Sequence, residues 1–217
     1  MALTLLAAAG GETLAAQYAQ ERIADSARRN LGLASAPEVH VHGFPVSLQL
    51  ARGVVTGADI DAVRVPADVD GRVLTVQGVA VHLRGVHQEQ DGGERADEAE
   101  VTATVAYDDL SAFYGVAIGR GDGDNRVAAT ARVPLFGQVS ASARVGVAGP
   151  GAVGLDDVLL PENVPPAARP LLERALERRT PLDGLPEGLA LRSVAVTDHG
   201  IVAHMSGHGV ELRPRTA

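Results

Sequence analysis

The sequence predicts an α+β fold dominated by β-strands, in which an antiparallel curled sheet or barrel surrounds helices and an apolar interior. Most segments alternate apolar and polar residues with period two, which is typical of strands. Only a few segments have helical spacing, and the strand–helix–strand alternation that builds a parallel sheet is missing. Turns are expected to be numerous because 25 glycines and 12 prolines are spread along the 217 residues without a period.

The composition favours an interior with room for a ligand. Hydrophobic residues make up 46% of the chain, whereas aromatic residues make up only 3%. The core is therefore expected to consist of Val, Leu and Ala. Small side chains fill space poorly, so an apolar cavity is expected.

The N-terminal part has two sections. Residues 12–31 have apolar side chains at roughly helical spacing and predict an amphipathic helix. The apolar run at residues 2–9 is too short to span a bilayer, so residues 1–11 are interpreted as the remnant of an anchor or signal, before a single domain over residues 12–217. No basic residue precedes the run. Two locations stay open: the cell envelope or exterior if an upstream signal was trimmed, and the cytoplasm if Met1 is the native start.

The rest of the chain is expected to be mostly strand. Alternation predicts strands over residues 38–42, 54–65, 72–84, 100–106, 126–133, 138–147, 152–160, 189–197 and 201–212. Short turns between the second and third of these, and between the last two, predict hairpins. Helical segments are expected at residues 47–52, at 108–114 with Asp108 or Asp109 as N-cap, and at 165–178 as a second amphipathic helix. Residues 88–98 are acidic and indicate a solvated loop, and residues 119–125 indicate a hairpin turn.

Several classes of function are excluded or disfavoured. The net charge is −8 and the chain has no lysine, so nucleic-acid binding is not expected, although a local arginine cluster could still contact a lipid head group in a peripheral membrane contact. Cysteine is absent, as are the GxSxG, GxxxxGKS and HExxH motifs, which removes the common hydrolase and nucleotide chemistries. His40 and His42 share one face of a predicted strand, but no third ligand is evident and a solvated face is the simpler interpretation. No metal and no cofactor are expected.

The few large side chains are the candidates for a ligand site. They are Phe44, Tyr107, Phe113, Tyr114, Phe136 and Met205. In a chain this poor in aromatic rings, they are expected either to line a cavity or its mouth, or simply to fill the core. Tyr107 is followed by Asp108 and is the one place where a phenol and carboxylates meet beside apolar residues, so these two are the acid/base candidates.

Residues 43–53, which read GFPVSLQLARG, resemble the signature segment of the LmeA-like family of actinobacterial cell-envelope proteins. The matching positions are Gly43, Phe44, Pro45, Gln49, Leu50, Arg52 and Gly53. The helix before this segment and the late segment PLDGLPEGL at residues 181–189 are also similar to the family. The likeness extends in order over nearly the whole chain.

The resemblance implies an antiparallel sheet wrapped on a long N-terminal helix, as in tubular lipid-binding folds, with an elongated apolar cavity. It also implies a phospholipid-like ligand. Leu48 is then expected to join the large side chains in the cavity, and Arg52 to contact the ligand's head group near Phe44.

Two functions follow from these expectations. The first is binding of a hydrophobic or amphiphilic small molecule, in which each buried methylene contributes about 0.8 kcal/mol. The alternative is a cofactor-independent cyclase that folds a linear polyketide-like substrate in the same cavity, in natural-product biosynthesis. Such ring formation depends mainly on shape and orientation, so the missing catalytic motifs do not exclude it.

Overall fold

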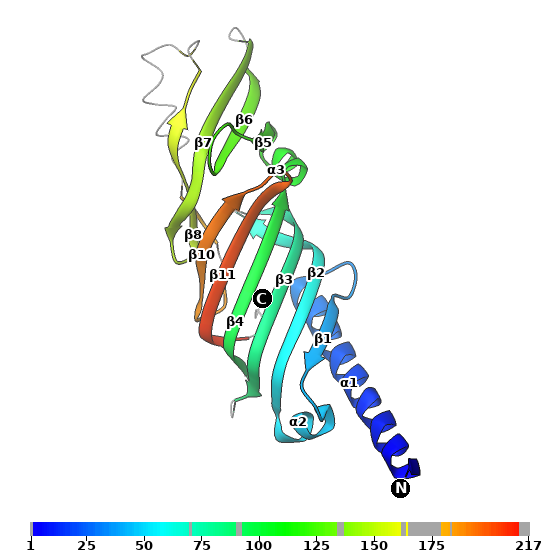
Figure 1. Cartoon of the computed structure of the whole chain (residues 1–217). Helices are drawn as coiled ribbons and strands as arrows, with labels where there is room; N and C mark the ends of the chain where they lie inside the picture. The colour runs from blue at the N-terminus through cyan, green and yellow to red at the C-terminus, as the bar shows by residue number, and fades with distance from the viewer. Residues whose placement is uncertain are drawn as a thin grey trace.

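The computed structural model describes residues 2–69, 71–89, 93–133, 137–161, 164, 179–182 and 184–212, and shows an elongated molecule built on two antiparallel sheets (Figure 1). The larger sheet has the order β1 (Glu38–His42), β2 (Val54–Val69), β3 (Arg72–Gln88), β4 (Glu94–Ala106), β11 (Gly200–Glu211) and β10 (Leu189–Val196). The smaller sheet has the order β5 (Ala117–Arg120), β6 (Arg126–Val133), β7 (Gly137–Gly149), β8 (Ala152–Leu159) and β9 (Arg179–Pro181). The helices described are α1 (Ala2–Leu31), α2 (Val46–Arg52) and α3 (Tyr107–Tyr114).

The predicted antiparallel, β-dominated fold is confirmed, but the strands form two sheets where a single curled sheet was expected. The chain leaves the six-stranded sheet after β4, passes through α3, builds the five-stranded sheet, and returns as β10 and β11. Among the described strands, neither sheet closes into a barrel.

The helix α1 packs beside the edge strand β1 of the larger sheet (Figure 1). It is helical from Ala2, where the sequence indicated a start at residue 12. Ala19 on the helix is buried, and Leu33, just after it, joins Ala62 and Val65 of β2 in a small core. Within the residues that the structure describes, no helix is both long enough and apolar enough to cross a bilayer.

The two sheets meet where β7 crosses β10. Val145, Leu191, Val194 and Met205 form the core at this contact. Asn125, in the turn between β5 and β6, ties the sheets together, because its amide donates to the Val194 carbonyl at 3.0 Å and its Oδ1 accepts from the Val196 N–H at 2.7 Å. The predicted hairpin turn at residues 119–125 is thus confirmed.

The acidic segment at residues 88–98 is only partly a loop. The strand β4 begins at Glu94, and Ala96 within it is fully buried, because this stretch pairs with β3 and β11. The Arg95 guanidinium forms ion pairs with Glu89 and Glu211, which offsets the local negative charge. The charge pattern therefore predicted the wrong structure here.

Two other differences concern element ends. The helix α3 begins at Tyr107 after Ala106, without a side-chain cap, so neither Asp108 nor Asp109 is the N-cap. Both lie in the first turn, where negative charge favours the positive end of the helix. The short strands β5 and β9 were not predicted. The helix expected at residues 165–178 lies outside the described residues.

Candidate functional site

The two faces of the six-stranded sheet differ in chemistry, and the register shows how. One row of paired residues crosses all six strands through Val39, Ile60, Val81, Val101, Met205 and Leu191. The neighbouring row reads His40, Asp59, His82, Glu100, Ser206 and Ala190. Because successive side chains in a strand point to opposite sides, the first row lies on one face and the second on the other. One face is therefore apolar and the other polar.

The apolar face is covered unevenly. Its β1–β2 edge is buried by Leu33 after α1, and its β10 edge is buried where the smaller sheet packs. In the middle, Val81, Val101 and Ala103 are only half-buried. The protein's described residues thus leave part of a continuous apolar surface without full contacts.

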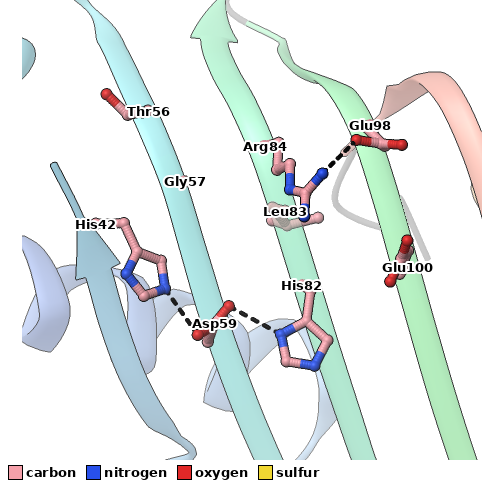
Figure 2. A pocket seen from close by; sticks show the side chains of 9 residues that line it. All are labelled: His42, Thr56, Gly57, Asp59, His82, Leu83, Arg84, Glu98 and Glu100. Carbon is pink, nitrogen blue, oxygen red and sulfur yellow. Dashed lines mark hydrogen bonds and ion pairs between the residues drawn. The ribbon is translucent and has the colours of Figure 1, made fainter.

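The polar face has a half-open depression of about 350 Å³ over β1 to β4 (Figure 2). Asp59 lies in it between two histidines: His42 Nε2 is 2.7 Å from Asp59 Oδ2, and His82 Nδ1 is 2.9 Å from Asp59 Oδ1. The hydrogen bond with His82 contributes most, and that with His42 next, to lowering the pKa of Asp59 below its usual value. Beside them, Arg84 donates to Glu98 at 3.1 Å. The depression can hold polar or charged groups and is unsuited to acyl chains.

Metal binding has little support on this face. Both carboxylate oxygens of Asp59 already accept hydrogen bonds from imidazoles. In the part of the chain that the structure describes, no group of three or more His, Asp or Glu side chains has the geometry to hold a metal ion.

The helix α2 lies at one end of the larger sheet. Three predicted site residues lie in this helix or just before it, and all three are exposed. Phe44, in the loop before α2, is 82% exposed, Leu48 is 43% exposed, and Arg52 in the last turn is also exposed. Gly43 before them has φ +93°, and a Cβ there would lie 2.6 Å from Gln49 Nε2, so the loop requires glycine.

Hydrogen bonds from two other elements hold α2 in place. The Glu12 carboxylate of α1 accepts from the Val46 N–H at 2.7 Å, from the Ser47 N–H at 3.3 Å, and from the Ser47 hydroxyl. Gln49 Oε1 accepts from the Thr56 N–H of β2 at 2.7 Å. The bond from the Ser47 hydroxyl lowers the pKa of Glu12.

The helix α3 lies at the opposite end of the larger sheet, at the junction of the two sheets (Figure 1). Phe113 and Tyr107 are packed or hydrogen-bonded there, whereas Tyr114 is 52% exposed. Phe113 is buried, with the Arg72 guanidinium 4.3 Å above its ring and Tyr114 edge-on at 5.0 Å. The Tyr107 hydroxyl donates to the Thr197 carbonyl at 2.6 Å, and burial raises the pKa of this phenol.

The predicted site residues therefore do not lie in one place. The α2 group and the α3 group are at opposite ends of the sheet, and Met205 is buried in the core between the sheets. Asp108 is exposed, and Phe136 lies outside the described residues. Sequence reasoning missed the half-buried centre of the apolar face. The sequence signal for this surface is the alternation of apolar and polar residues within β3 and β4. Alternation alone does not show which residues of different strands lie side by side; that requires the strand register.

The matches with known proteins are limited to one family. A family model described as LmeA-like phospholipid-binding matches residues 10–206. No curated protein and no solved structure matches the chain significantly.

Proposed function

The chain belongs to the LmeA-like phospholipid-binding family, and from this premise we propose that it binds a phospholipid-like amphiphile whose acyl chains lie on the apolar face of the six-stranded sheet. The observation that carries the proposal is the half-buried centre of that face, at Val81, Val101 and Ala103. An acyl chain there supplies the apolar contacts that the described residues leave unmade.

The chemistry of the face suits this ligand. Between the edges that the chain itself covers, the half-buried part of the row, at Val81 and Val101 on the paired strands β3 and β4, presents apolar side chains. Each methylene removed from water contributes about 0.8 kcal/mol, so a long chain gains enough to offset the cost of being ordered.

The cyclase hypothesis has no comparable observation in its favour. Its acid/base candidates are Tyr107 and Asp108, and the Tyr107 hydroxyl is engaged with the Thr197 carbonyl. Binding without chemical change is therefore the function that we propose.

The first test is native mass spectrometry of the full chain purified from its host, with extraction and identification of what co-purifies. A stoichiometric phospholipid is the expected result. An empty protein that also takes up no short-chain phospholipid in solution overturns the proposal, and a stoichiometric polyketide-like molecule replaces it with the cyclase.

A pair of substitutions on adjacent strands places the ligand. Val81→Thr with Val101→Thr keeps the strand shape but puts hydroxyls on the apolar face, and is expected to weaken short-chain phospholipid binding about tenfold. Thr102→Val with Thr104→Val changes the polar face of β4 and serves as the matched control, with unchanged affinity expected. Equal affinity for both variants and the unmodified protein means that the ligand lies elsewhere.

A further inference from the structure

The end of the molecule at α2 has the most exposed large apolar side chain in the described part of the chain. Phe44 is 82% exposed, and Leu48 and Leu50 nearby are 43% and 39% exposed. Exposed single apolar residues are common, but an almost fully exposed phenyl ring at the end of a molecule with 3% aromatic residues is not typical of a solvated surface.

This exposure results from an ordered local structure. Glu12 binds the first turn of α2 from one side, and Gln49 binds the Thr56 N–H on the other. Val46 beneath them is buried. The loop is thus anchored on both flanks, while Phe44 makes few contacts with its own chain.

Arg52, in the last turn of α2, is an exposed cation at this end. Within the described residues it forms no ion pair with a carboxylate, and Glu12 is engaged with α2. A cation beside exposed apolar side chains matches the phosphate and acyl layers of a lipid surface.

We propose that this end, the docking tip formed by Phe44, Leu48 and Arg52, docks on the surface of a phospholipid bilayer. Phe44 enters the acyl layer and Arg52 contacts a phosphate. The proposal rests on the proposed function, because a phospholipid ligand has to come from a membrane. The apolar face begins close to the tip, since Ala58 and Leu83 lie near the α2 end of β2 and β3.

A bilayer fits the tip better than a second copy of the chain does. Three partly exposed side chains offer on the order of 300 Å², whereas a stable protein interface buries about 800 Å² on each partner. Inserting one ring into a bilayer requires no matching surface.

The test uses tryptophan as a reporter, because the chain has none. Phe44→Trp places it at the tip, and Leu159→Trp places it on the smaller sheet, where Leu159 is 53% exposed. Both variants are mixed with phosphatidylcholine–phosphatidylglycerol vesicles containing brominated phosphatidylcholine. We expect the emission of Trp in the first variant to shift to shorter wavelength and to be quenched by bromine, with no change in the second. In parallel, Phe44→Ser is expected to weaken vesicle binding at least about tenfold, and Arg52→Gln about fivefold.

Three results overturn the docking tip: no change in the Phe44→Trp emission, equal quenching in both variants, or a shift that depends on protein concentration without vesicles, which indicates a second copy. Uptake of short-chain phospholipid below its micelle concentration is measured on the same samples. Uptake without vesicle docking rejects the tip and leaves the proposed function standing. Docking on vesicles without uptake of the short-chain phospholipid supports the docking tip and rejects the proposed function.

Discussion

The short helices α2 and α3 lie at opposite ends of the same sheet, and the phenylalanine at each differs in burial. Phe113 of α3 is 8% exposed under a guanidinium, whereas Phe44 before α2 is 82% exposed. Both helices are anchored by hydrogen bonds to other elements, so the difference is not one of order. It lies in the surroundings of each ring: Phe113 is buried beneath Arg72 at the junction of the sheets, whereas Phe44 before α2 faces solvent.

This comparison separates stability from recognition. Side chains at α3 contact β3, β5 and the turn after β10, so they stabilise the arrangement of the two sheets. Side chains at α2 leave apolar surface available to something outside the chain. Substitutions at the two ends are therefore expected to affect different measurements.

The largest contrast is expected between two phenylalanine truncations. Phe113→Ala removes a buried ring together with its contact to Arg72, and should lower the free energy of unfolding by about 3 kcal/mol. Phe44→Ala should change it by less than about 0.5 kcal/mol, because the ring is already in water. Urea unfolding of both variants measures the difference. Similar losses at the two positions would show that Phe44 is packed in solution.

A smaller effect is expected at Tyr107. Tyr107→Phe removes the hydrogen bond to the Thr197 carbonyl and should cost about 1 kcal/mol. Burial raises the pKa of this phenol, so the folded state holds the proton more tightly than the unfolded state does. The associated stability is present below about pH 10 and is lost as the pH rises through the folded-state value. Unfolding curves across alkaline pH should show a steeper loss for the unmodified protein than for Tyr107→Phe.

The smallest effect is expected at Glu12, and its pH dependence has the opposite direction. The Ser47 hydroxyl lowers the pKa of Glu12, so its contribution is present above the carboxyl's ordinary value and is lost as the pH falls through the folded-state value. Glu12→Ala should lower Tm by about 1 °C at neutral pH and by less in acid. Glu21→Ala, on the same helix, is the control. An equal Tm change at acidic and neutral pH would mean that the carboxylate does not hold α2.

Local patterns predicted most strands but not the two sheets. Alternation depends only on neighbouring residues, so β1, β6 and the hairpin of β10 and β11 were predicted within a residue or two. The acidic start of β4 was missed because strand formation there depends on distant residues. This stretch pairs with β3 and β11, and Arg95 within it forms ion pairs with carboxylates of β11 and of the turn before β4. Asn125 was seen only as part of a turn, although it joins the sheets through bonds to β10.

The sequence by itself determined that this is an antiparallel β-protein without nucleophile or nucleotide motifs, and that residues 43–53 resemble a lipid-binding family. Only the tertiary structure decided which large side chains are buried. Phe44 and Phe113 both precede or belong to short helices after strands, and local patterns treated them alike. Their exposure differs because burial depends on distant partners: Arg72 lies over Phe113, and in the described structure nothing comparable covers Phe44.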